Sequence, residues 1–431
     1  MGELRELLES LHGADIAQVV QTVRIEQQLQ LLRLMTVPKA AETLQELDSE
    51  QQAELLLELD RLTAARVLNE MSNDDLADLL ANITPDQVTR ILSLMRVDDA
   101  ADIRGLMRYP EDTAGGLMTN EFIALHQDLT ADQAIETLRE LAPDAETIYY
   151  VYVVNREKTL VGVLSLRDLI VAPPQQPLAA VMKRNIIRVQ ADTDQEEVAR
   201  MVSKYDLLAL PVVDENDVLL GIVTVDDVID VIEEEANEDI LRLAANVSET
   251  EREFEMPAWY RAKKRLPWLI VLLFGGLLAG NIIQTFEQTL VSVAALAYFI
   301  TVMAGEAGNV ATQSLAVIVR GIATGEINNR GVWRVIGKEV EVGLLVGVIC
   351  GLVLAITATV WQHSLGLGIV VGVSLSLSMM IATIFGAFFP LVIHRLGLDP
   401  AVASGPFITT LNDVISMLIY FSFATALIAW L

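Results

Sequence analysis

Residues 404–431 read SGPFITTLNDVISMLIYFSFATALIAWL, and this stretch decides the class of fold. From Phe407 onward it holds one charged side chain, Asp413, in a segment long and apolar enough to span a bilayer. A carboxylate at membrane depth costs about 3 kcal/mol or more unless it faces protein, water or a cation. Asp413 is therefore a candidate functional residue. The alternative is an aspartate near the membrane interface that caps a helix after Gly405-Pro406.

The negative charge of the chain is concentrated in its first part. Residues 1–256 hold 51 acidic and 21 basic side chains, a net charge of −30, whereas the remainder holds seven acidic and nine basic ones. This balance disfavours nucleic acid as a partner, because phosphate binding needs basic patches, and it favours cations. The single cysteine, Cys350, excludes a disulfide within one chain. The polar start MGELRELLES predicts no cleavable signal peptide, so we expect the polar part to stay in the cytoplasm.

Residues 1–110 are rich in leucine, alanine and acidic residues and lack the alternation typical of strands. Short helical units recur, separated by cap residues such as Leu47-Asp48-Ser49, with Pro85 suited to a first helical turn. This spacing predicts an all-α superhelical domain, a stack of short helices. The predicted helices cover 39–47, 50–59, 63–71, 74–81, 85–95 and 98–107.

Residues 118–236 contain an internal repeat. One copy includes IYYVYVVNREKTLVGVLSLRDLI, ending at Ile170, and the other includes LLALPVVDENDVLLGIVTVDDVIDVI, ending at Ile232. Each copy predicts a strand, a polar turn, a second strand and a helix that begins at Ser165 or Thr224. The repeat resembles a tandem pair of CBS domains, α/β modules that often bind adenine nucleotides. We place these domains at 118–176 and 177–239.

Residues 226–239 read DDVIDVIEEEANED and carry eight carboxylates in fourteen positions. On a helix, many of these like charges stand three or four residues apart. That spacing destabilises the helix unless cations or basic groups neutralise the charges. The alternative interpretation is a solvated acidic helix without a ligand.

Five apolar segments follow the basic stretch RAKKRLPW at 261–268, each near or above the roughly 20 residues that a spanning helix needs. They cover about 268–286, 290–319, 340–361, 368–393 and 405–430, and the second is long enough to be tilted or broken. The nine basic residues of this part all lie on one side of the predicted spans. The positive-inside rule therefore puts the polar domains in the cytoplasm and the C-terminus outside.

Two polar stretches interrupt the apolar segments: AGEAGNVATQS at 304–314 and GPFITTLND at 405–413. Their glycines permit irregular backbone, which at this depth is tolerated only where it is buried in protein or lines a water-filled cavity. Carboxylates, amides and hydroxyls all offer oxygen ligands. Without a thiolate or histidine cluster, they indicate a hard cation such as Mg²⁺ or Ca²⁺.

Over essentially its full length the chain resembles the MgtE family of magnesium channels and transporters. Residues 307–313, AGNVATQ, match the family pattern Gly-Gly-Asn-Ala-Gly-x-Gln with alanine at Ala307 and Ala311, and residues 406–413 match Pro-Phe-x-Thr-Thr-x-x-Asp. DAETIYY at 144–150 and TDQEEVAR at 193–200 are also typical of the family. The resemblance implies a multidomain fold. An all-α superhelical N domain (1–110) and the α/β tandem CBS domains lead through a connecting plug helix (240–264) to an all-α membrane domain of five transmembrane helices (265–431).

The resemblance also implies the site residues. Asp413 would hold the pore cation, with Asn309 nearby, and Tyr150, Arg167 and Asp168 match positions that contact ATP. Cytosolic Mg²⁺ sites are implied at Glu42, Asp74, Asp78, Glu196, Asp206, Asp226, Asp227, Asp230, Glu235, Glu238 and Asp239.

We therefore expect a homodimeric Mg²⁺ channel or transporter in the lipid bilayer of the plasma (inner) membrane, with its pore at the subunit interface. Bound Mg²⁺ would hold the pore closed, and any ATP would be regulatory. The chain lacks a Gly-x-x-x-x-Gly-Lys phosphate-binding motif and is not expected to be an enzyme. Two alternatives stay open: a transporter of another divalent cation (Ca²⁺, Mn²⁺ or Co²⁺), and a membrane-anchored sensor of Mg²⁺ or nucleotide.

Overall fold

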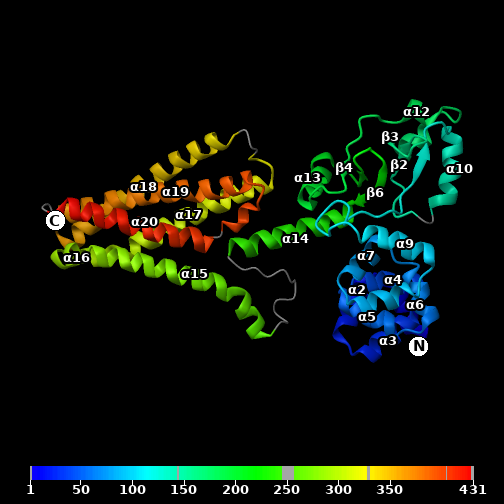
Figure 1. Ribbon diagram of the computed structural model, residues 1–431, viewed down its shortest axis with the longest axis horizontal. Helices are drawn as coiled ribbons and strands as arrows, with labels where there is room; N and C mark the ends of the chain where they lie inside the picture. The colour runs from blue at the N-terminus through cyan, green and yellow to red at the C-terminus, as the bar shows by residue number, and fades with distance from the viewer. Residues whose placement is uncertain (1, 143–144, 245–256, 328–330, 404, 429–431) are drawn as a thin grey trace. The chain divides into compact units, whose positions relative to one another are not determined.

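A computed structural model describes residues 2–142, 145–244, 257–327, 331–403 and 405–428 (Figure 1). The chain forms two compact units, residues 1–233 and 234–431. The boundary falls inside helix α14 (Val225–Leu243), which contains the whole acidic run of residues 226–239. Of the expected plug helix, residues 245–256 lie outside the described residues, and residues 258–264 form the first turns of α15 (Ala258–Thr285).

The first unit begins with the predicted stack of short helices. The ends of the last six lie within three residues of the predicted ones, whereas the three helices before residue 37 were not delimited from the sequence. Asp48 and Asp60 cap two of them by accepting backbone N–H groups at 2.9 and 3.1 Å, and Pro85 occupies a first turn. Leucines such as Leu44, Leu55 and Leu68 are fully buried between the helices. The helices are α1 (Gly2–Ser10), α2 (Gly13–Thr22), α3 (Ile25–Leu34), α4 (Val37–Gln45), α5 (Ser49–Glu58), α6 (Arg61–Leu68), α7 (Asn73–Ala81), α8 (Pro85–Leu92) and α9 (Val97–Leu106).

Each predicted repeat forms a three-stranded sheet, ordered β1-β2-β3 and β4-β5-β6. In both sheets the first pair is parallel and the second antiparallel, and the register shifts at equivalent valine pairs. The strands are β1 (Ala124–His126), β2 (Tyr150–Val154), β3 (Leu160–Ser165), β4 (Val189–Gln190), β5 (Ala209–Val213) and β6 (Leu219–Thr224). The helices around them are α10 (Ala131–Leu141), α11 (Leu166–Val171), α12 (Leu178–Val181) and α13 (Gln195–Tyr205). Tyr152 and Ile222 belong to one buried cluster that joins the two sheets.

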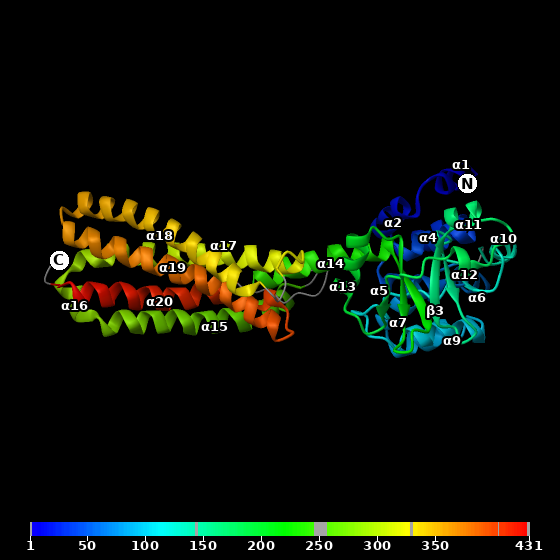
Figure 2. The same cartoon turned by 90° about the horizontal axis from the view of Figure 1, so that it is seen from above.

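The second unit contains the five predicted membrane-spanning helices, which lie side by side in both views (Figures 1 and 2). They are α15, the segment Ala294–Ala323, α18 (Val332–Gln362), α19 (Leu365–Arg395) and α20 (Gly405–Ala426). The second span is interrupted near its start, one of the two possibilities expected from its length. A short helix α16 (Glu287–Ser292) and a 3₁₀ turn η2 (Ala294–Phe299) precede α17 (Ile300–Ala323). A further 3₁₀ turn, η3 (Pro400–Val402), connects α19 to α20.

The backbone is helical through both polar stretches, which corrects the expectation of irregular backbone there. Residues 304–314 lie inside α17, and the described residues of 405–413 open α20. The hydroxyls of Thr312, Thr409 and Thr410 donate to carbonyl oxygens one turn earlier, at 3.1, 2.9 and 2.9 Å. These hydroxyls form their hydrogen bonds within their own helix, so their polar groups have partners and the helix continues without a break.

Candidate functional site

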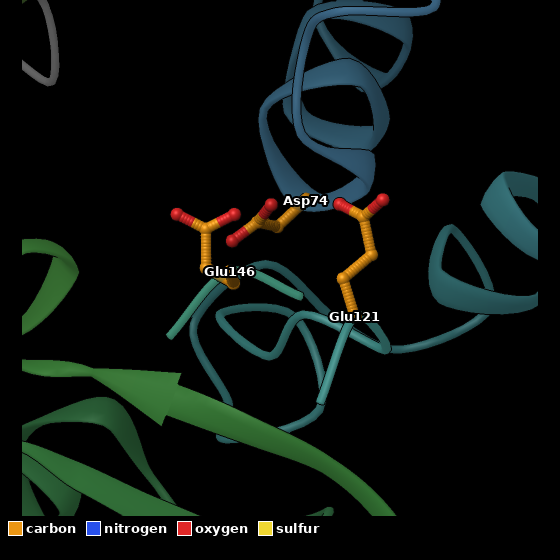
Figure 3. A group of neighbouring side chains, drawn as sticks. All are labelled: Asp74, Glu121 and Glu146. Carbon is orange, nitrogen blue, oxygen red and sulfur yellow. The ribbon is translucent and has the colours of Figure 1, made fainter. Parts of the chain in front are cut away.

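One group of carboxylates in the first unit has the geometry of a metal centre. Asp74, Glu121 and Glu146 each present an oxygen within 4.8 Å of the others, and within the described ranges no other trio of acidic, histidine or cysteine ligands lies this close. Figure 3 shows the side chains converging, with Asp74 coming from α7 and the two glutamates from the loops before β1 and β2. Ligands that offer only oxygen suit a hard divalent cation.

Local hydrogen bonds hold this carboxylate group together. Asp74 stands in the first turn of α7, where a negative charge complements the helix dipole. The neighbouring Asn73 donates its backbone N–H to the Glu121 carboxylate (3.1 Å) and its side-chain amide to the Asn120 side-chain oxygen (2.8 Å). The backbone N–H of Glu146 donates to the carbonyl oxygen of Glu121 (2.8 Å). The helical stack and the first repeat are thus joined where the carboxylates meet.

Two charges of this group, those of Asp74 and Glu146, are poorly compensated by the protein. Asp74 is 8% exposed, and its Oδ1 is buried with no hydrogen-bond partner in the described structure. Burial, and then the adjacent charge of Asp75, raises the pKa of Asp74 to about 6. Partial loss of hydration, and then the charges of Asp74 and Glu121, raises the pKa of Glu146 to about 7, although its side chain still reaches solvent. A divalent cation would satisfy the buried oxygen and relieve the repulsion.

Two aspartates at the start of α14 extend the same electrostatic environment. The Thr224 hydroxyl donates to the Asp227 carboxylate at 2.5 Å. Burial, and then the charge of Asp74, raises the pKa of Asp227 to about 8. The charge of Asp226 contributes to the raised pKa of Glu146. The structure therefore brings three of the predicted ligands, Asp74, Asp226 and Asp227, within electrostatic reach of one another.

Glu42 on α4, also a predicted ligand, is engaged by protein groups. The Lys39 ammonium donates to its carboxylate at 2.6 Å, and the Gly13 backbone N–H donates at 2.8 Å. The hydrogen bond from Lys39 is the main cause of a lowered pKa at Glu42. Since a lysine already neutralises this carboxylate, Glu42 has less need of a cation than Asp74 has in this conformation.

Five further predicted ligands stand outside the three-carboxylate group. They are Asp78 on α7, Glu196 and Asp206 at the two ends of α13, and Asp230 and Glu235 on α14. Asp206 ends α13 in the left-handed conformation, with φ of 51°. All five stay predictions as metal ligands.

In the second unit, the last turns of α14 meet the connection between α19 and α20. Arg242 forms ion pairs with Glu238, one turn earlier, and with Asp399. Asp399 also caps η3 by accepting the Ala401 backbone N–H at 2.8 Å. Burial, and then the charge of Asp399, raises the pKa of Asp239 to about 6. The predicted ligands Glu238 and Asp239 thus lie beside an additional carboxylate and an arginine.

An open cavity of about 490 Å³ lies beside β2 and α11. Tyr150 and Arg167, two of the predicted nucleotide contacts, line it together with Tyr149, Ser165, Leu166, Ile170, Val171 and Leu208. The third, Asp168, is not part of the lining. Its backbone N–H donates to the Ser165 hydroxyl (3.0 Å), and its carboxylate lies 3.5 Å from the Lys183 ammonium. Apolar walls with a tyrosine and a guanidinium suit a flat aromatic base and a phosphate.

The predicted pore residues stand on two membrane helices that pack closely. Gly308 of α17 is so near Thr409 of α20 that an added Cβ would lie 2.7 Å from the threonine methyl group. Asn309, next to this contact, is exposed on α17. Asp413 lies one turn beyond Thr409, and its Oδ1 is buried without a hydrogen-bond partner in the described chain.

The sequence did not single out Glu121, Glu146 or Asp399. Glu146 belongs to the stretch DAETIYY, but nothing in that stretch indicates its spatial neighbour Asp74. Asp399-Pro400 is a helix-start pattern, which predicts a cap but no partner on α14. All three depend on contacts between segments far apart in the chain.

Family models match most of the chain, apart mainly from residues 235–299 and the two ends. The model for MgtE, a divalent cation transporter, matches residues 300–423, and that for the MgtE intracellular N domain matches residues 11–112. The CBS domain model matches residues 114–174 and 178–234. The predicted helical domain, tandem repeat and membrane part are thus confirmed in kind and order.

Individual relatives agree with these matches. The magnesium transporter MgtE of Bacillus subtilis is 47% identical over 323 residues, 75% of this chain and 71% of that protein. The magnesium transporter MgtE of Thermus thermophilus is 46% identical over 328 residues, 76% of this chain and 72% of that protein. The crystal structure of the cytosolic domain of the Mg²⁺ channel MgtE in complex with ATP is similar with a TM-score of 0.51 and 46% identity, covering 53% of this chain and 93% of that one. These relatives are transporters and not enzymes. The chain therefore belongs to the MgtE family of magnesium transporters.

Proposed function

We propose that this protein is a Mg²⁺-selective channel or transporter that admits Mg²⁺ to the cytoplasm and closes when cytosolic Mg²⁺ binds its acidic domains. One observation carries the proposal: the chain combines a membrane-embedded carboxylate, Asp413, with undercompensated carboxylates around Asp74. The first can meet a cation in transit, and the second can respond to its concentration. Similarity to magnesium transporters supports the choice of ion.

Permeation would use Asp413 and Asn309 as ligands of a largely hydrated ion, because Mg²⁺ gives up its water reluctantly. In a homodimer with the pore between subunits, each chain would contribute one Asp413. With the polar domains inside and the C-terminus outside, the membrane potential drives entry. At 100 mV it contributes about 4.6 kcal/mol for two charges.

Gating would follow from the repulsion among the cytosolic carboxylates. When Mg²⁺ is scarce, the charges around Asp74 and Asp227 oppose close packing of the segments that carry them, as their raised pKa values indicate. When Mg²⁺ is abundant, bound ions neutralise these charges and stabilise the packed, closed arrangement. The ion shifts the equilibrium only by its differential affinity for the two states, and several sites acting together make that difference large.

ATP would act as a regulator that is bound and not hydrolysed. The cavity beside Tyr150 and Arg167 offers the aromatic and cationic groups that a nucleotide needs. The similar cytosolic domain that was crystallised with ATP supports this choice of ligand. ATP bound in that cavity would stabilise whichever conformation of the protein has the cavity fully formed.

The test is Mg²⁺ uptake into liposomes containing the full-length protein, with Asp413→Asn and the loop variant Glu326→Gln compared with wild type. We expect Asp413→Asn to reduce the Mg²⁺ flux more than about tenfold, because the charge in the membrane that attracts the ion is gone. The control should keep its flux. Uptake of Ca²⁺, Mn²⁺ or Co²⁺ in preference to Mg²⁺ would establish the rival transporter, and no uptake by wild type would favour a membrane-anchored sensor.

Gating has its own test in the acidic helix. Neutralising Asp226, Asp227 and Asp230 together should leave flux less sensitive to Mg²⁺ on the cytosolic side. Currents through the purified protein, recorded over a range of cytosolic Mg²⁺, measure this directly. If Mg²⁺ still closes the triple variant as it does wild type, the acidic run is only a solvated helix.

A further inference from the structure

The exposed face of the membrane helix α17 is polar from Glu306 to Gln313, and the next exposed turn carries the apolar Val317. Glu306, Asn309 and Gln313 follow one another at helical spacing on this face, and all three are exposed. The opposite face, with Ala307, Ala311 and Leu315, is buried against α19 and α20. The exposed faces of α15 and α18 are apolar, as contact with lipid requires; they present Leu269, Leu273, Phe274 and Leu277, and Leu344, Leu345, Val348 and Leu352. The outer face of α17 from Glu306 to Gln313 is thus not built for lipid.

Glu306 stands far from both ends of its span, Ala294–Ala323. A carboxylate in the middle of a membrane helix faces protein or water, because exposure to hydrocarbon is costly. The described part of the chain leaves Glu306 exposed and does not provide that cover. What fits this position is a water-filled path along α17, and the amides of Asn309 and Gln313 on the same face suit such a path.

Contacts between α17 and α20 set the depth of Glu306 relative to Asp413. The two helices run antiparallel, because Thr312 is close to Gly405, Gly308 is close to Thr409, and Tyr420 donates to the carbonyl oxygen of Leu296 (2.9 Å) in η2. Figures 1 and 2 both show them side by side.

From the contact of Gly308 with Thr409, Glu306 lies two residues and Asp413 four residues further in the same direction. At about 1.5 Å of rise per residue, the two carboxylates differ in depth by about 3 Å. Because Gly308, and not Glu306, is the residue of α17 that meets α20, the two carboxylates share a depth and not a contact. In a water-filled path at this depth, both negative charges attract a passing cation.

We infer that Glu306 is a second carboxylate of the ion path, which binds the hydrated divalent cation at the depth of Asp413 and raises its occupancy there. This inference rests on the proposed transport function and adds a residue to it. Asp413, with one oxygen buried, supplies a fixed charge, while the exposed Glu306 supplies a charge that faces the path. Together they favour a divalent over a monovalent cation, because affinity for hard cations grows with the number of ligand charges.

Transport over a range of external Mg²⁺ tests this role. Full-length wild type and Glu306→Gln are compared in liposomes with Glu341→Gln, a control that removes the same exposed charge from the first three turns of α18, outside the path proposed along α17. We expect Glu306→Gln to raise the Mg²⁺ concentration for half-maximal flux by roughly tenfold and to weaken the preference for Mg²⁺ over Na⁺. The control should match wild type.

The outcomes separate the two proposals. Equal half-saturation in wild type and Glu306→Gln, with flux still abolished by Asp413→Asn, would overturn the role of Glu306 and leave the transport function standing. No Mg²⁺ flux in wild type would overturn the transport function itself.

Water access provides a readout that does not need transport. In a Cys350→Ala background, Glu306→Cys should react with a charged methanethiosulfonate added to the liposomes, because its thiol can ionise only in water. Val348→Cys on the apolar face of α18 should stay unmodified. Mass spectrometry measures both, and a Glu306→Cys as inert as Val348→Cys would contradict a water-filled path along α17.

Discussion

The two regions that carry unusual carboxylates use the same ligand chemistry at different densities. Around Asp74, three carboxylates from three separate segments come within 4.8 Å of one another and compete for protons near neutral pH. In the membrane unit, Asp413 has threonines and an asparagine as its neighbours along α20. A site that senses an ion has to hold it, whereas a site that conducts has to release it. The two proposed roles thus go with different numbers of charges per site, several for the proposed sensor and few for the proposed path.

The largest expected effect comes from removing the central charge of the dense group. Asp74→Asn should raise the cytosolic Mg²⁺ needed to halve the flux by roughly a hundredfold, about 2.7 kcal/mol, and leave the maximal flux at low Mg²⁺ unchanged. The amide keeps the shape of the side chain and removes a buried, repelled charge, so we expect no loss of stability without Mg²⁺. Flux recorded against cytosolic Mg²⁺ measures the shift.

Glu42→Gln is the matched control for that experiment, because Glu42 is an acidic residue of the same helical stack whose charge Lys39 already neutralises. It should shift the Mg²⁺ dependence little. An equal shift in both variants would mean that net charge, and not the convergence of three carboxylates, sets the sensitivity. A lower maximal flux in Asp74→Asn would mean that Asp74 affects conduction as well as the response to cytosolic Mg²⁺.

The sequence predicted the architecture and one of the two carboxylate regions, the one around Asp413. Periodicity, caps and the internal repeat predicted the helical stack, the two sheets and five spans, because each depends on local pattern. Asp413 was evident as a single charge in an apolar segment. The dense site was only partly visible, since Asp74 and Asp227 lie in acidic runs, whereas Glu121 and Glu146 sit in ordinary loops. Their convergence is a tertiary contact, and no local pattern encodes it.

The second expected effect is a pH dependence to which the dense site contributes three raised pKa values, against one at Asp239 near the end of α14. The pKa values of Asp74, Glu146 and Asp227 are raised to about 6, 7 and 8. Between the ordinary pKa near 4 and these values the folded state binds more protons than the unfolded state. Without Mg²⁺, the free energy of unfolding therefore falls as pH rises through this range.

Because Mg²⁺ must displace those protons, its stabilising effect should grow with pH. We expect the Mg²⁺ affinity of the full-length protein to be roughly tenfold higher at pH 8 than at pH 6. Thermal unfolding at graded Mg²⁺ and two pH values measures this, and Asp74→Asn should flatten the difference. A constant Mg²⁺ effect across this range would show that the carboxylates around Asp74 are not the ones that bind the ion.

The smallest expected effect concerns Arg242, the basic group that competes with a cation near α14's end. Its partners Glu238 and Asp399 are partly exposed, so its ion pairs contribute only about 0.5–1 kcal/mol. Arg242→Gln should raise basal flux at low Mg²⁺ by roughly threefold, since the end of α14 loses a metal-independent anchor on the connection before α20. The same change leaves two carboxylates without their arginine, so Mg²⁺ should close this variant more steeply than wild type.

Arg200→Gln, which removes a surface pair with Glu197 at 2.8 Å, is the control and should change neither property. If Arg242→Gln instead behaved like Arg200→Gln in both measurements, Glu238 and Asp399 would take no part in sensing Mg²⁺.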